Sequence, residues 1–153
     1  MNSLDLLAHL NPEDLVYEAT ALFAWKIGAA KDMDQVAAFF YKGGPSLPQA
    51  SSRRLHDAIG FITDDRPEKK YWTLVKEELT KFLCTNDKKY KVLWTRINAL
   101  EGKGTNAIVL LISGYLGEQF GLEGSILAGF VAVFFYGVIK IGKEAYCQLT
   151  IPE

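Results

Sequence analysis

The densest group of side chains that could do chemistry lies between residues 53 and 65. It combines two arginines, a histidine and three aspartates: Arg53, Arg54, His56, Asp57, Asp64 and Asp65. A histidine beside a carboxylate is a common general base, so an enzyme site near 53–65 is one hypothesis. Adjacent residues on a helix point apart, however, so His56 and Asp57 cannot form a dyad unaided. We favour the solvent face of a short helix and its following loop, and expect no catalytic residue.

Metal and cofactor chemistry have little support in the residue types. The two histidines, His9 and His56, lie far apart, and the chain has no Cys-x-x-Cys or His-x-x-x-His pattern. Zinc sites use such spacings, so we expect neither a metal nor a cofactor. The run Gly102-Lys103-Gly104-Thr105 lacks the spacing and the preceding strand of a phosphate loop. We expect a turn between two helices there, with Thr105 capping the second helix.

Cys84 and Cys147 are the two cysteines of the chain. Two cysteines in 153 residues do not make a disulfide framework, and each lies at the edge of an apolar helical pattern. Buried free thiols are the simplest interpretation. With no secretory signal visible in the first residues, they favour a cytoplasmic protein. A Cys84–Cys147 bridge is the alternative if the two helix ends meet.

Charge is small overall but uneven along the chain. The net charge of −1 gives no general attraction to nucleic acid. Residues 66–103 hold ten basic and five acidic side chains, whereas residues 1–42 hold six acidic and three basic ones. We expect these two segments to attract each other across the fold. The basic run around Lys88–Lys91 is then a solvent-exposed helix face, and no nucleic-acid partner is expected.

The spacing of apolar residues is helical through most of the chain. Steps of three and four residues recur in five segments, at 15–27, 33–40, 55–62, 71–82 and 90–100. Asn11-Pro12, Asp32 and Asp87 are helix-start signals, and no segment alternates as a strand would. We predict a single all-α domain over residues 1–153. It contains amphipathic helices in 1–63 and a basic-faced helix pair in 67–101.

The last third is far more apolar. Gly104 to Gly117 and Gly124 to Ile139 are runs of fourteen and sixteen uncharged residues. A helix that is apolar on all sides must be buried in protein or lipid, and both runs fall short of the roughly 20 residues that span a bilayer. We predict an apolar helical hairpin over 105–148, whose second helix, from about Glu123 to Gln148, is the centre of a bundle of six to seven helices. Small residues should let these helices approach closely: Gly114, Gly117, Gly121, Ser125, Gly129 and Ala132.

These patterns favour a non-enzymatic protein that acts by protein–protein interaction, as an adaptor, accessory or inhibitor protein. Its partner would be another protein or a second copy of the chain. The candidate contact residues are aromatic and basic side chains outside the inward stripes: Trp25, Phe39, Tyr41, Arg53 and Arg54. The alternative is a protein that inserts its 104–142 hairpin into a membrane, with lysines at the lipid surface. That alternative uses Phe130, Phe134, Phe135, Lys140 and Lys143.

Overall fold

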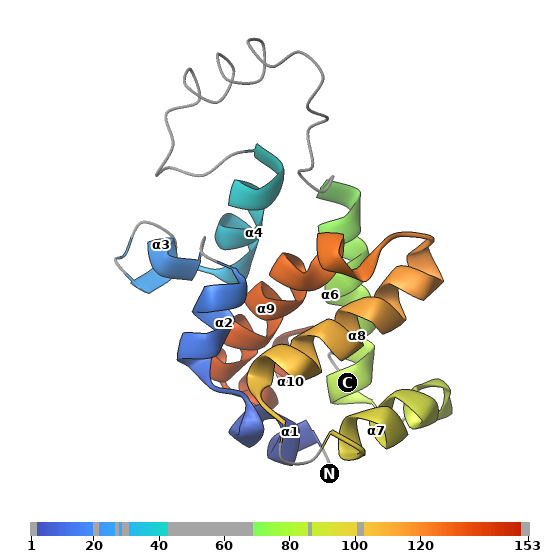
Figure 1. Ribbon diagram of the computed structural model, residues 1–153. Coiled ribbons are helices and arrows are strands. Elements are labelled where there is room, and N and C mark those ends of the chain that lie inside the picture. Colours follow the sequence, from blue (N-terminus) through green and yellow to red (C-terminus); the bar gives the residue numbers. More distant parts are fainter. Residues whose placement is uncertain are drawn as a thin grey trace, which may run out of the picture.

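The structure is a computed structural model, and it describes residues 3–19, 22–26, 28, 31–42, 69–85, 87–100 and 103–150. Every regular element in these ranges is a helix, so the predicted all-α class is confirmed (Figure 1). The helix expected at 55–62 and the polar cluster from Arg53 to Asp65 lie outside the described residues.

The described residues up to Lys42 form four short α-helices. These are α1 (Ser3–His9), α2 (Pro12–Glu18), α3 (Phe23–Lys26) and α4 (Met33–Lys42). Asn11 caps α2 as predicted, since its side-chain oxygen accepts the Glu13 N–H at 2.9 Å. The expected continuous helix up to residue 27 is wrong. The backbone leaves the helical region at Ala19 (φ −137, ψ 87), and this bend buries both Ala19 and Leu22.

The helix pair expected in 67–101 becomes α6 (Lys69–Cys84) and α7 (Lys91–Asn98), joined through the 3₁₀ helix η2 (Lys88–Tyr90). Asp87 opens the second stretch as predicted, because its carboxylate accepts the Lys89 N–H at 3.0 Å. The inward stripe of α6 is buried: Trp72, Val75, Leu79, Phe82 and Leu83.

The C-terminal part consists of α8 (Thr105–Phe120), α9 (Gly124–Ile141) and α10 (Lys143–Thr150). Gly121 ends α8 with a left-handed φ of 73°, which a glycine adopts without strain. The close helix approach expected from small residues occurs at Gly124, where an added Cβ would lie 2.8 Å from the Gly114 Cα. The helix expected to continue to Gln148 is wrong, because Gly142 (φ 96°) ends α9 and α10 starts beyond it.

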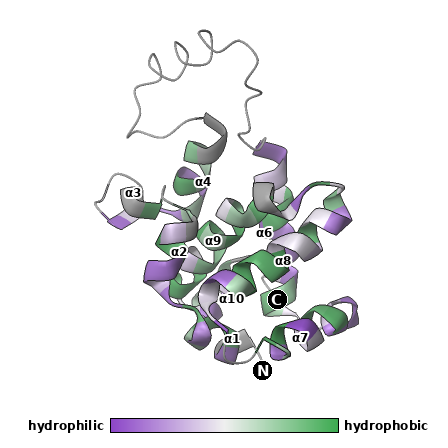
Figure 2. Cartoon of the chain, viewed as in Figure 1, coloured by the Kyte–Doolittle hydropathy of each residue, from purple (hydrophilic) through white to green (hydrophobic). Residues whose placement is uncertain are grey.

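Helix α9 lies at the centre of the fold, as predicted. It packs against α2, α4, α6, α8 and α10 (Figure 1), and residues 130–138 are all buried. Figure 2 shows most of α9 and the middle of α8 in the hydrophobic colour. Because two expected long helices are interrupted, the described residues contain more helices than the six to seven expected. Within the described ranges, no helix combines the length and the hydropathy needed to cross a membrane.

Candidate functional site

The aromatic residues predicted to contact a partner contribute to the core where the structure describes them. Trp25 is partly buried, and its ring meets that of Tyr136 edge-on, with centroids 5.4 Å apart. Phe39 is also partly buried and packs against the same hydrophobic cluster. Tyr41 lies on α4, but its side chain is outside the description, as are Arg53 and Arg54. Trp25 and Phe39 are therefore partly covered by the core and partly exposed.

The phenylalanines that the membrane hypothesis assigns to lipid lie in the protein core. Phe130, Phe134 and Phe135 are each 0% exposed, surrounded by the helices that pack on α9. Lys140 is exposed and its ammonium lies 5.7 Å from the centre of the Tyr136 ring, a cation–π distance. Lys143 is partly buried at the start of α10. Any insertion of these phenylalanines would require the surrounding helices to separate first.

The outer side of α8 is exposed yet carries no charge. Leu110 is 53% exposed, and its helical neighbours on that side are exposed or partly exposed: Asn106, Ala107, Leu111 and Gly114. These five residues, which we call the α8 strip, share one face because they lie one, four, five and eight positions from the first. Charge returns only at Glu118, near the end of the helix.

Sequence reasoning missed the α8 strip because apolar residues occupy both sides of α8. Ile108 and Ile112 are buried while Leu110 between them is exposed. A helix that is apolar all round gives no periodic signal for which side faces solvent. The one available signal was the uncharged run itself, which we expected to be buried in protein or lipid.

Polar side chains join α4 to α6. Asp34 accepts the Trp72 Nε1–H at 2.8 Å and pairs with the Lys76 ammonium at 3.0 Å. The Trp72 side chain is buried against the Phe130 ring. The Asp34–Lys76 ion pair joins the acidic segment 1–42 to the basic segment 66–103, a contact of the kind expected between them.

Another polar cluster lies between α6 and η2. The buried Tyr90 hydroxyl donates to the Glu78 carboxylate at 2.7 Å, and Lys89 pairs with the same carboxylate at 3.1 Å. Burial, followed by the hydrogen bond to Glu78, raises the pKa of Tyr90 well above its ordinary value. The neutral phenol is thus the form that the fold stabilises. This cluster holds the turn into α7 against α6.

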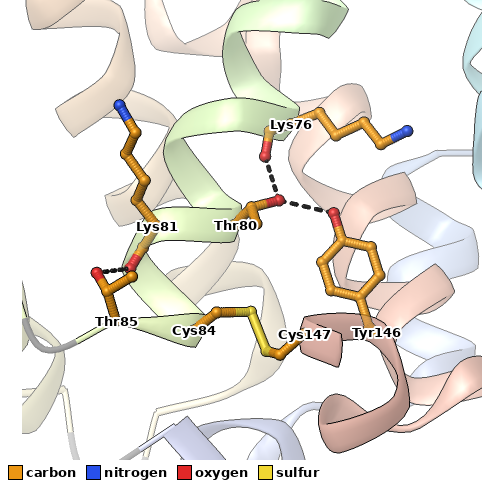
Figure 3. Close-up of a disulfide and its surroundings, with 7 residues drawn as sticks. All are labelled: Lys76, Thr80, Lys81, Cys84, Thr85, Tyr146 and Cys147. Atoms are coloured by element: carbon orange, nitrogen blue, oxygen red, sulfur yellow. Dashed lines mark hydrogen bonds between the residues drawn. A yellow bond between two sulfur atoms is a disulfide. The ribbon is translucent and has the colours of Figure 1, made fainter. Parts of the chain in front are cut away.

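The two cysteines form a disulfide, so the interpretation as free thiols is corrected. Cys84 at the end of α6 is bonded to Cys147 of α10, with their Cα atoms 5.6 Å apart (Figure 3). Both residues are partly exposed. The end of α6 meets the middle of α10 because Gly142 ends α9 and α10 then packs against α6. The sequence pattern did not specify this tertiary contact.

Tyr146, which directly precedes Cys147 in the chain, connects α10 to both α6 and α9. Its hydroxyl lies 2.7 Å from that of Thr80 (Figure 3). Because Thr80 already donates to the Lys76 carbonyl at 2.6 Å, Tyr146 is the donor between the two hydroxyls. The Tyr146 ring packs edge-on against Phe134, with centroids 5.5 Å apart. Burial raises the pKa of Tyr146.

Thr105 does not cap its own helix, contrary to the prediction. Gly104 occupies the N-cap position of α8 and makes no side-chain cap. The Thr105 hydroxyl is instead buried and accepts the Asn11 N–H at 2.8 Å. It therefore joins the start of α8 to the start of α2, two sites 94 residues apart in sequence.

In the part of the chain that the structure describes, no group of three or more histidine, cysteine, aspartate or glutamate side chains is placed to hold a metal ion. The hypothesis of an enzyme site near 53–65 falls on residues outside that part. What the described residues define is an all-α protein with a buried apolar central helix, an uncharged outer strip and a disulfide-bound last helix. The chain matches no known family model, and comparison with curated proteins and with solved structures finds no relative.

Proposed function

We propose that this protein is non-enzymatic and acts by binding another protein, as an adaptor, accessory or inhibitor protein, through the α8 strip. The observation that supports this is an exposed helix face without a single charged residue. Helices at a protein surface normally direct charged residues to solvent, and 23% of this chain is charged. Interface cores differ from the remaining surface chiefly by their depletion of charge.

The shape of the strip suits a protein partner. Leu110 stands between the small residues Ala107 and Gly114, so a partner can approach the helix backbone on both sides of one projecting side chain. Burial of the exposed half of a leucine contributes about 1 kcal/mol. Leu110 is therefore a candidate anchor that enters a pocket, and the neighbouring residues supply shape complementarity.

A lipid surface is the competing occupant, as the membrane hypothesis requires. The α8 strip is an accessible, uncharged part of the 104–142 hairpin, whereas Phe130, Phe134 and Phe135 of α9 are enclosed. Peripheral binding to lipid through Leu110 would precede any insertion of α9. The variants Leu110→Glu and Leu149→Glu distinguish a protein partner from a lipid surface.

The test uses a photo-crosslinking amino acid at position 110, introduced in the cells that make the protein. Position 149 is the matched control, because Leu149 on α10 is 76% exposed compared with 53% for Leu110. We expect one discrete protein adduct from position 110 and none from position 149. With that partner purified, Leu110→Glu should raise the dissociation constant at least tenfold, or about 1.4 kcal/mol, and Leu149→Glu should leave it unchanged.

Three outcomes decide the proposal. An adduct with a second copy of the chain would identify the partner as the protein itself and would support the proposal. Co-sedimentation with neutral or anionic vesicles that Leu110→Glu abolishes, and Leu149→Glu does not, would assign the strip to lipid and overturn it. Equal labelling from positions 110 and 149 would also overturn it.

A further inference from the structure

We propose that the Cys84–Cys147 disulfide is a reversible redox latch, which holds α10 against α6 and α9 and releases it when a dithiol reduces the bond. This inference does not depend on the α8 strip. It concerns a different surface and stands on the disulfide, the anchoring of α10 and the glycine that precedes it.

Besides the disulfide, helix α10 packs against α6 and α9. Of the α10 side chains that the structure describes, Tyr146 alone is fully buried, whereas Glu144, Ala145, Gln148 and Leu149 are exposed. A helix of eight residues is too short to be stable alone in water. Its docking therefore depends on Tyr146 and on the covalent bond from Cys147.

The joint between α9 and α10 allows them to separate. Gly142 adopts φ 96° and has no heavy atom within 4 Å of the position its Cβ would take. Helix α9 is already complete there, since the Gly142 N–H donates to the Val138 carbonyl at 2.7 Å. Movement of α10 about this glycine would leave the hydrogen bonds of α9 intact. The joint therefore has the freedom that a hinge requires.

Release of α10 would change the surface of the core. The Tyr146 ring covers Phe134 edge-on at 5.5 Å, and Phe134 is 0% exposed in the latched form. Undocking would expose apolar surface of α9 and would leave the Thr80 hydroxyl to solvent. The oxidised protein thus keeps its central helix closed, and the reduced protein opens one side of it.

The chemistry is ordinary thiol–disulfide exchange. A thiolate of an external dithiol attacks one sulfur of the Cys84–Cys147 bond, which forms a mixed disulfide and frees the other cysteine as a thiolate. The second thiol of the reductant then displaces the remaining cysteine. Two electrons and two protons reach the protein thiols, and the dithiol becomes a disulfide. Because Cys84 and Cys147 are both partly exposed, a reductant can reach the bond in the folded protein.

The test is hydrogen exchange of residues 143–150 in oxidised protein, in protein reduced with dithiothreitol, and in a Cys84→Ser/Cys147→Ser variant. We expect the α10 amides to exchange at least tenfold faster in the two forms that lack the disulfide, while the amides of residues 130–138 remain protected. Reoxidation of the reduced protein should restore protection in α10. A Tyr146→Phe variant, oxidised, serves as the control, because it loses the Thr80 hydrogen bond but keeps both the ring and the disulfide.

Either of two results would overturn the proposal. Equal protection of α10 in the oxidised and reduced forms would show that the bond is a static crosslink. Loss of protection in α9 together with α10 would show that reduction unfolds the whole protein instead of releasing one helix. Binding of a hydrophobic dye supplies a second readout, which should increase on reduction while the far-ultraviolet helix signal changes by no more than the loss of α10.

Discussion

Removal of the disulfide should lower the free energy of unfolding by about 4 kcal/mol. The bond joins residues separated by 63 positions. For a loop of that length the chain-entropy relation gives roughly 14 cal/mol/K of lost unfolded-state entropy, or about 4 kcal/mol at 25 °C. A domain of this size unfolds with a free energy of about 5–15 kcal/mol, so the Cys84→Ser/Cys147→Ser variant should still fold. Its melting temperature should fall by about 8–16 °C.

Urea unfolding followed by circular dichroism measures this loss directly. Wild-type protein in a reducing buffer is the matched control, because it lacks the bond but keeps both sulfur atoms. The reduced wild type and the double variant should agree with each other. A loss below about 1 kcal/mol in both would refute the reasoning, because it would mean that the bond constrains neither the unfolded chain nor the docking of α10.

Three other predictions test the helix contacts. Gly124→Ala should destabilise the fold by about 1–3 kcal/mol, because its Cβ would meet the Gly114 backbone at 2.8 Å. Gly114→Ala, whose Cβ meets nothing within 4 Å, should stabilise the fold by about 0.5–1 kcal/mol. Urea unfolding measures both changes, and opposite signs would refute this reasoning. Thr105→Val should cost about 1–3 kcal/mol because it leaves the Asn11 N–H without its acceptor, whereas Thr105→Ser should cost less; equal losses would contradict this. Folding raises the pKa of Tyr90 above its ordinary value of 10.0, so the neutral phenol contributes fully to the free energy of unfolding below pH 10, and this contribution is lost at higher pH. Tyr90→Phe should therefore make the free energy of unfolding fall less steeply above pH 10. An unchanged alkaline unfolding curve would contradict this prediction.

Local chemistry accounts for the parts of the fold that were predictable. Asn11 and Asp87 bond to backbone N–H groups two residues away, so their roles can be inferred from neighbouring residues alone. The central place of α9 was also predictable, because residues 124–139 carry no charge and a helix without a polar side has to be enclosed.

The candidate site was less predictable. Trp25 and Phe39 were expected at a surface because they lie off their helices' inward stripes, but packing from α9 and its neighbours covers both partly. Leu110 belongs to a run expected to be buried in protein or lipid, yet it is exposed, because α8 packs through the side that carries Ile108 and Ile112. A one-dimensional pattern cannot choose between two apolar sides of one helix.

The sequence by itself determined the all-α class, the helix starts at Asn11 and Asp87, and the burial of the central helix. Each of these depends on composition or on contacts within one helical turn. Only the tertiary structure decided that Cys84 meets Cys147, that Thr105 accepts from Asn11, and that one side of α8 stays uncovered. These contacts join helices that are far apart in sequence, and which helices meet is decided by the close packing of all their buried side chains together.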